Sequence, residues 1–281
     1  MRSKPRTERP AGEDPGRIDL HMHTDRSDGR FPPDELLERA LAGRLDLIAV
    51  ADHDLPNVLA PGVHTGDGHS VRVIAAAEIS GHHAGRELHL LVYFPAEMPK
   101  SFQDFLRERA KARAARYDAA REKLGFPDLP AADNAAHAGE RSLTRHHLFH
   151  ALKEAHHVKD MREGFALLGG SSVVPLIELS FVDAIRTARD AGAVTSWAHP
   201  SLADAQAWTA EFVKAGLEGL EGVRPHVDRR TRNGLKALAE KHALLLTGGS
   251  DWHGWHEPPL GTFAVTGERA RAFVARLDRA A

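Results

Sequence analysis

Histidine and acidic residues recur beside short apolar runs along this 281-residue chain. His21 and His23 follow the first run, and Asp52 and His53 follow the second. The other candidates at or near such runs are Asp28, Glu78, His89, His199, Asp251 and His253. Residues two apart in an extended segment project to the same side, so each His-x-His or Asp-x-His pair could serve one site. Imidazole and carboxylate ligands without thiolate suit Zn, Mn or Fe(II) in a hydrolytic site.

The composition limits the class of protein. Nineteen histidines is a high count, and the absence of cysteine excludes disulfides, iron–sulfur clusters, thiolate zinc sites and a Cys nucleophile. A net charge of −2 gives no electrostatic case for a broad nucleic-acid or membrane surface. No run of about 18 apolar residues is present, and the opening segment lacks the apolar stretch of a signal peptide. We therefore expect a cytoplasmic protein with a disordered tail at residues 1–16.

The elements that must position these side chains alternate between strand and helix. Apolar runs predict strands at 17–20, 46–51, 71–76, 88–94, 193–197, 217–223 and 243–246. Helical patterns follow at 33–42, 182–191, 204–215, 229–242 and 268–279. Such alternation predicts a parallel sheet or barrel, in which the carboxyl ends of the strands build the active site. The Ala-, Arg- and Glu-rich stretch at 98–172 interrupts the rhythm and predicts a helical insertion between barrel parts at 17–97 and 173–281.

Six motifs carry a family resemblance. They are DLHMHTDRSDGRF (19–31), IAVADHD (48–54), AAEIS (76–80), ELHLLVYF (87–94), WAHP (197–200) and GGSDWHG (248–254). Their order and spacing resemble the polymerase and histidinol phosphatase (PHP) superfamily. The most similar branch contains stand-alone nucleotide phosphatases, including those acting on nucleoside 3′,5′-bisphosphates, and 5′–3′ exoribonucleases acting on short RNA. LTRHHLFHAL (143–152) resembles a further segment of that branch. One departure is Trp252, where another aromatic or smaller residue is frequent.

The resemblance implies a distorted, TIM-like (β/α)7 barrel with a helical insertion acting as a cap. It implies a site for two or three divalent ions (Mn, Zn or Fe). The first ion would take His21, His23, Glu78 and Asp251, the second Asp28, His53 and His253, and the third Glu78, His89 and His199. The resemblance further implies that four of these residues are catalytic: Asp28, His53, Glu78 and Asp251.

The same resemblance implies a substrate. The expected reaction is hydrolysis of phosphomonoesters of nucleotides, such as AMP or a nucleoside 3′,5′-bisphosphate, and of the 5′ ends of short RNA, by a hydroxide that bridges two ions. Arg145, with His147, is the candidate phosphate clamp, because a guanidinium group offers a planar fork to two oxygens. Arg224 and His226 also follow a predicted strand and are further candidates. We expect a phosphorylated small molecule or short oligonucleotide as partner, with no membrane and no obligate protein partner.

Three alternatives stay open. A histidinol-phosphate-type phosphatase typically has histidine at the place of Asp28. An amidohydrolase-like enzyme also begins with His-x-His, but it usually needs a carboxylated Lys or a Glu at a middle strand, and the ADHD segment fits it poorly. A metal-binding regulatory or scaffold domain would be expected to lose ligands, whereas every ligand position of the family pattern is filled here.

Overall fold

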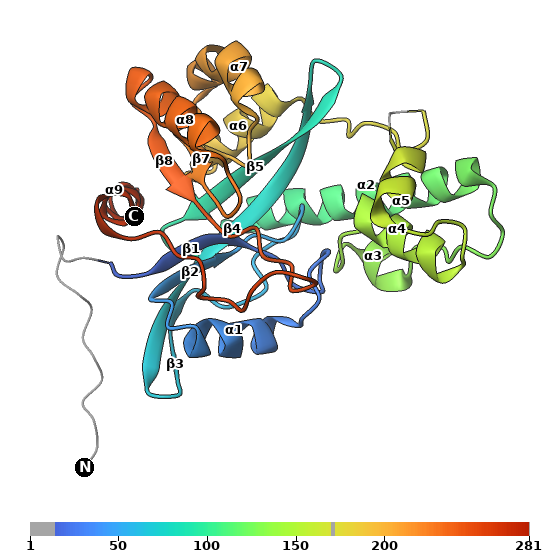
Figure 1. Ribbon diagram of the computed structural model, residues 1–281, viewed down its shortest axis with the longest axis horizontal. Helices are drawn as coiled ribbons and strands as arrows, with labels where there is room; N and C mark the ends of the chain where they lie inside the picture. The colour runs from blue at the N-terminus through green and yellow to red at the C-terminus, as the bar shows by residue number, and fades with distance from the viewer. Residues whose placement is uncertain (1–14, 170–171, 281) are drawn as a thin grey trace.

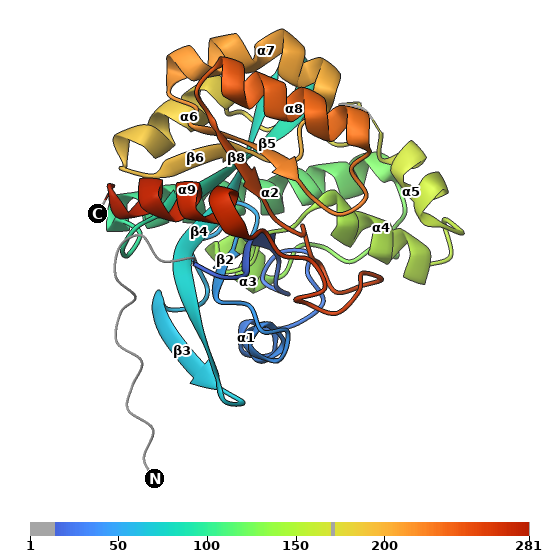
Figure 2. The ribbon, with the colours of Figure 1, turned by 60° about the vertical axis from the view of Figure 1, so that its left-hand side comes forward.

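The strands form one sheet that curls into an incomplete barrel (Figures 1 and 2). The computed structural model describes residues 15–169 and 172–280, so the tail predicted at 1–16 lies almost wholly outside the described residues. Within them, eight strands pair in the order β1-β2-β4-β5-β6-β7-β8, with β3 added beside β4. The strands are β1 (Ile18–Met22), β2 (Leu47–Val50), β3 (Gly62–Gly66), β4 (His69–His83), β5 (Arg86–Phe94), β6 (Val194–Trp197), β7 (Gly219–Val223) and β8 (Leu245–Gly248). A parallel bridge between Met22 and Trp252 brings the two ends of this order together.

The direction of β5 corrects the expectation of a parallel sheet. β1, β2 and β4 are parallel to one another, as are β6, β7 and β8, but β5 is antiparallel to both β4 and β6. β4 and β5 are joined by Ala84 and Gly85, both with positive φ. A two-residue turn leaves no room for a crossover helix, so the two strands must run in opposite directions. The barrel-type α/β architecture predicted from the sequence is confirmed, with this hairpin inside it.

Two sets of helices surround the sheet. The barrel helices are α1 (Pro33–Ala42), α6 (Phe181–Asp190), α7 (Leu202–Ala215), α8 (Arg229–Lys241) and α9 (Gly267–Asp278). The inserted helices are α2 (Lys100–Leu124), α3 (Asn134–Ala138), α4 (Arg145–Glu154) and α5 (Met161–Leu167). Figure 1 shows α6, α7 and α8 grouped on one side of the sheet, while α2 runs from the sheet out to the other inserted helices.

Burial explains why these segments take their places. β2 is buried at all four positions, as expected for a strand covered on both faces. Side chains of β4, β5 and β6 pack with those of α6, α7 and α8 in one large apolar cluster. The inserted segment has an apolar cluster of its own, which includes Tyr117, Leu143 and Leu152. Among the described helices, none is both long and apolar enough to cross a membrane.

Candidate metal centre

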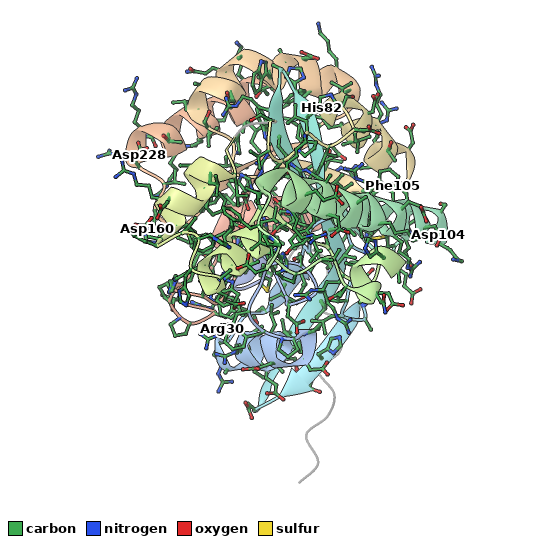
Figure 3. The ribbon with its side chains drawn as sticks, turned by 90° about the vertical axis from the view of Figure 1, so that its right-hand side faces the viewer. Arg30, His82, Asp104, Phe105, Asp160 and Asp228 are labelled. Atoms are coloured by element: carbon green, nitrogen blue, oxygen red, sulfur yellow. The ribbon has the colours of Figure 1, made fainter. Side chains whose placement is uncertain are left out.

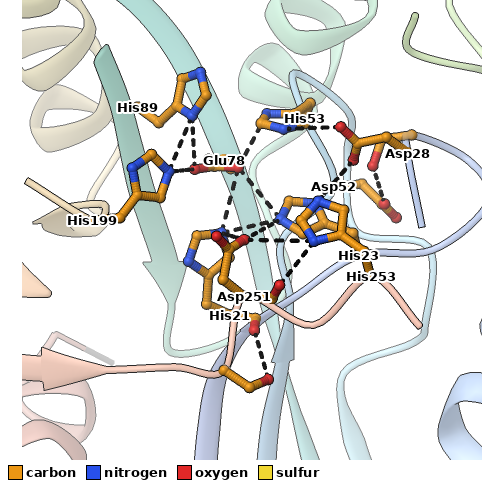
Figure 4. Close-up of polar contacts among 12 residues, drawn as sticks. His21, His23, Asp28, Asp52, His53, Glu78, His89, His199, Asp251 and His253 are labelled. Carbon is orange, nitrogen blue, oxygen red and sulfur yellow. Dashed lines mark hydrogen bonds and ion pairs between the residues drawn. The ribbon is translucent and has the colours of Figure 1, made fainter. Parts of the chain in front are cut away.

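A first group of ligand atoms gathers where β1 meets the turn after β8 (Figure 4). The Nε2 atoms of His21 and His23 lie 3.1 Å apart, and both rings are fully buried. Oδ1 of Asp251 is 3.4 Å from Nε2 of His21 and 3.3 Å from Nε2 of His23. Gly249 permits this approach, because a Cβ at that position would lie 2.3 Å from the Cβ of His21.

A second group lies on the other side of His23. Asp28 places Oδ2 3.5 Å from Nε2 of His53 and Oδ1 3.3 Å from Nε2 of His253. One ligand atom from each of His23, Asp28, His53 and His253 falls within 4.8 Å of the others. The three residues predicted for a second ion are therefore together, and His23 joins them as well as the first group.

A third group surrounds one carboxylate oxygen of Glu78, Oε1. Its Oε1 is 3.2 Å from Nδ1 of His89 and 3.2 Å from Nε2 of His199. Its Oε2 faces the other groups, 3.0 Å from Nδ1 of His53 and 3.4 Å from Nε2 of His21. Glu78 is 1% exposed and lies between all three groups, which is the arrangement that a bridging carboxylate requires.

The position of Glu78 differs from the strand-end expectation, whereas His89 lies within a strand as predicted. Glu78 lies in the middle of β4, because that strand continues to His83, and His89 lies within β5. Ser80 pairs with His89 across the hairpin, so Glu78 is the diagonal neighbour of His89 on the same ladder. These two candidates meet through antiparallel pairing, whereas the ends of parallel strands supply the others.

The residues present fit divalent metal ions. Nδ1 of His23 is buried and has no hydrogen-bond partner among the described residues, and Oδ1 of Asp28 and Nδ1 of His53 are buried close to His253 and Glu78 without forming a hydrogen bond to them. Each unpartnered buried polar atom of this kind costs about 1–3 kcal/mol. A cation placed between these imidazole nitrogens and carboxylate oxygens would bind them all at once. Imidazole together with carboxylate suits divalent transition metals.

Neighbouring histidines keep the carboxyl groups of Glu78 and Asp28 ionised. Burial alone would raise the pKa of Glu78, but the nearby His53, His21 and His89 outweigh it and hold that pKa well below its usual range. Burial also opposes ionisation of Asp28, and His53 with His253 again brings the pKa well below its usual range. Both groups are therefore ionised at neutral pH.

The histidines divide into two kinds. Burial lowers the pKa of His53 to about 3, so its ring is neutral and offers a lone pair. Burial also opposes protonation of His89 and His253, but Glu78 beside the first and Asp28 beside the second raise each pKa to about 10. Binding of a cation between these partners would release the protons that the carboxylates retain on the two rings.

The sequence is similar to the sequences of several phosphoric ester hydrolases. No protein-family profile matches the chain. The chain is 28% identical over 247 residues to the 5′-3′ exoribonuclease Rnm of Escherichia coli, covering 84% of each protein. It is 28% identical over 252 residues to a 3′,5′-nucleoside bisphosphate phosphatase of Chromobacterium violaceum, covering 84% of this chain and 87% of that protein. A phosphoribosyl 1,2-cyclic phosphate 1,2-diphosphodiesterase of Eggerthella lenta is 27% identical over 256 residues, covering 84% of this chain and 94% of that protein.

A solved structure agrees with these relatives. It is a protein of Bifidobacterium adolescentis assigned as a metal-dependent phosphoesterase, with a TM-score of 0.72, 25% identity and coverage of 92% of this chain and 96% of that one. The chain is similar to these phosphoesterases over most of its length. It is accordingly a phosphoric ester hydrolase, as the motif pattern predicted.

Glu221 belongs to this site, although it was not among the residues predicted from the sequence. It comes from β7, is fully buried, and supplies no atom to the three groups. Its Oε1 lies 2.9 Å from Nδ1 of His21, and its Oε2 accepts a hydrogen bond from the backbone N–H of His199 at 2.8 Å. Because Glu221 holds Nδ1 of His21, Nε2 is the ring atom that faces the first group. The run 217–223 contains two glutamates, Glu218 and Glu221, and these charges inside a predicted strand were the available signal.

Asp52 has a supporting place in the site. One oxygen accepts hydrogen bonds from the backbone N–H of Thr24 at 2.8 Å and the hydroxyl of Ser27 at 2.5 Å, and the other accepts from the Thr24 hydroxyl at 2.6 Å. These bonds hold the turn that leads to Asp28. Asp52 follows a strand as predicted, but its oxygens accept hydrogen bonds from this turn.

Arg145 and His147 begin α4 at the mouth of the site. An Arg145 guanidinium nitrogen is 3.4 Å from Oε2 of Glu87, whose Oε1 is 3.7 Å from Nε2 of His89. Arg145 therefore reaches the neighbourhood of the third group. Nδ1 of His147 instead accepts a hydrogen bond from the backbone N–H of Thr144 at 3.0 Å and completes a capping box. Burial is the main cause that lowers the pKa of His147 to about 4.

Arg224 and His226 lie on the other flank. They follow β7 and line a cavity of about 540 Å³ that also touches Asp251 and Trp252. Nε of Arg224 is buried without a hydrogen-bond partner among the described residues, and its nearest carboxylate oxygen, on Glu221, is 3.9 Å away. The cavity thus shares Asp251 with the first group.

Proposed function

We propose that this protein is a PHP phosphoesterase that hydrolyses phosphomonoesters of nucleotides, with AMP or a nucleoside 3′,5′-bisphosphate as substrate, and that it acts also at the 5′ ends of short RNA. The names of the exoribonuclease and bisphosphate phosphatase relatives support this substrate class. The observation that carries the proposal is the gathering of imidazole and carboxylate atoms from separate strands around Glu78.

We assign two or three divalent ions, Mn, Zn or Fe, to the three groups. The proposed ligands are those of the family pattern: His21, His23, Asp28, His53, Glu78, His89, His199, Asp251 and His253. Bound ions would supply positive charge to the phosphoryl oxygens and make water acidic enough to act as a nucleophile near neutral pH. No protein nucleophile is required in this scheme.

The chain's own groups bind and orient the phosphate. Arg145 presents a fork of N–H donors suited to two phosphoryl oxygens, and Glu87 holds that fork beside His89. His89, His199 and His253 are 21%, 31% and 23% exposed at their side chains, so the mouth of the site is open to a ligand there. His53 cannot donate a proton near neutral pH, because burial lowers its pKa to about 3.

The cavity beside Asp251 is our candidate for the organic part of the substrate. Its volume of about 540 Å³ is in the range usual for small-molecule sites. Trp252 and Phe263 contribute apolar surface, which suits a base or a ribose ring, and Arg224 and His226 supply donors for a hydroxyl or a second phosphate. A cyclic phosphodiesterase among the relatives makes ring opening of a cyclic phosphate a second candidate activity.

A turnover screen tests the proposal. Metal-stripped protein reloaded separately with Mn, Zn or Fe(II) would be assayed on AMP, a nucleoside 3′,5′-bisphosphate, short 5′-phosphorylated RNA, a ribose 1,2-cyclic phosphate, histidinol phosphate and p-nitrophenyl phosphate. We expect the highest kcat/KM on a nucleotide substrate. Preference for histidinol phosphate, or for the cyclic phosphate, would reject the nucleotide assignment, and activity that survives thorough chelation would reject the metal assignment.

A further inference from the structure

Two arginines of the inserted helix α2 reach into the barrel. Arg109 and Arg113 are four residues apart and so share one face of the helix. Arg113 is only 3% exposed, which is unusual for a cation of this size. Asp104, five residues before Arg109 on α2, lies at the edge of the molecule in Figure 3. The same helix therefore has one face directed at the barrel and another directed at solvent.

Both arginines bind the same two partners. Nε of Arg113 donates to Oδ2 of Asp54 at 2.6 Å, and Nε of Arg109 donates to Oδ1 of Asp54 at 2.8 Å. Arg113 also donates to the hydroxyl of Ser80, and Arg109 donates to the carbonyl oxygen of Ser80 at 2.6 Å. Asp54 and Ser80 are fully buried. Four charge-assisted hydrogen bonds thus join one helix to two points of the barrel.

Those two points flank candidate metal ligands. Asp54 follows His53 directly, and Ser80 is two residues beyond Glu78. The backbone N–H of Asp54 donates to the carbonyl oxygen of Glu78 at 2.8 Å, and the backbone N–H of Ser80 donates to Oδ1 of Asp54 at 3.2 Å. Asp54 has φ of 49°, a left-handed conformation that costs free energy and needs support from its surroundings.

Stability alone is a weak explanation for this arrangement. Removing two guanidinium groups and a carboxylate from water costs several kcal/mol per ion, and apolar side chains of similar size would often be equally stable. Apolar side chains could not, however, donate hydrogen bonds to Asp54 and Ser80, and so could not hold both residues at fixed positions. Arg113 also donates to the carbonyl oxygen of Leu143 at 3.3 Å, two residues before the start of α4 and Arg145.

We infer that Arg109 and Arg113 are positioning residues for His53 and Glu78, so that the inserted helix forms part of the metal centre. The inference rests on the proposed metal site but not on the identity of the substrate. The insertion then has a structural role in the site in addition to any role as a cap over the substrate. Neither arginine touches a ligand atom, and both act through Asp54 and Ser80.

The test compares Arg113→Lys and Arg109→Lys with the matched control Arg107→Lys on the same helix. Arg107 pairs with exposed Asp104 and is 41% exposed at its side chain. Lysine keeps the charge but cannot present a fork to two acceptors. Metal-stripped proteins would be titrated with Co²⁺, whose visible absorption reports affinity and coordination, and the thermal unfolding of each metal-free protein would be recorded in parallel.

We expect Arg113→Lys to weaken Co²⁺ binding by about 10- to 100-fold, the range found when groups that support metal ligands are removed. Arg107→Lys should match the unchanged protein. A variant that loses thermal stability but keeps the Co²⁺ affinity and spectrum would overturn the inference and leave a purely structural ion pair. If Arg113→Lys did not fold, Arg109→Lys would decide by the same criterion. Because Co²⁺ binding is read without substrate, failure of the nucleotide assignment would leave this test intact.

Discussion

Replacement of Glu221 by glutamine changes one buried oxygen of the site to an NH₂ group and keeps the size of the side chain. Glu221 accepts two hydrogen bonds, from Nδ1–H of His21 and from the backbone N–H of His199. Glutamine can accept only one of them at its carbonyl oxygen, because its NH₂ group is a donor. Either Nδ1–H of His21 or the backbone N–H of His199 is therefore left facing the NH₂ group, a second donor, in a buried place.

The size of the effect follows from these contacts. A hydrogen bond to a charged group contributes about 1.5–3 kcal/mol. Loss of about 2 kcal/mol corresponds to roughly a 30-fold change in an equilibrium constant, since about 1.4 kcal/mol is a factor of ten. This lies within the about 10- to 100-fold loss of affinity or activity seen when partners of metal-bound histidines are changed. We expect Glu221→Gln to weaken metal binding and to lower kcat/KM by a similar factor.

Calorimetric titration of the metal-free protein with Zn²⁺ or Mn²⁺ would measure the affinity, with kcat/KM measured at limiting metal and again at saturating metal. Glu218→Gln is the matched control, because Glu218 lies three residues earlier and pairs with Arg276 instead of with the site. Added metal should restore much of the lost activity if affinity is the cause. Unchanged affinity and unchanged kcat/KM in Glu221→Gln would refute the role given to this carboxylate.

Other outcomes can be checked separately. Exhaustive chelation should abolish phosphoesterase activity and Mn²⁺ or Zn²⁺ should restore it, whereas activity that persists would contradict the metal requirement. Arg145→Met should raise KM for a phosphomonoester with a loss of about 10-fold in kcat/KM, because a charge-assisted fork is removed, and an unchanged KM would reject Arg145 as the clamp. Asp52→Asn should lower both metal affinity and thermal stability, since Thr24 and Ser27 lose a charged acceptor, and an effect on neither would reject its supporting role. His147 has a pKa lowered to about 4 in the folded protein, so the unfolded chain binds more protons between about pH 6.5 and 4 and stability should fall as pH decreases through that window. His147→Gln, followed by urea unfolding at several pH values, should flatten that dependence, and an identical slope in the variant would exclude His147 as its source.

Local sequence was sufficient for much of the architecture. The continuous apolar run at β2 and the helical pattern of α8 each predict their element, because burial on one or both faces sets a period that a short window contains. His21 and His23 could be paired for the same reason, since two residues of a strand that are two apart share a face. The order of the motifs then indicated a metal-dependent phosphoesterase, and the comparisons agree with that prediction.

The tertiary structure decided how those elements meet. Nothing in the local pattern of β4 indicated that it continues past Glu78 and turns back as an antiparallel hairpin, and only that pairing brings His89 beside Glu78. Glu221 lies 200 residues from His21, and Arg113 lies 59 residues from Asp54. A single sequence records the types of such residues but not their distances in space, which depend on how separate strands and helices pack. The sequence therefore determined which side chains could hold a metal, and the packing determined which other residues hold those side chains in place.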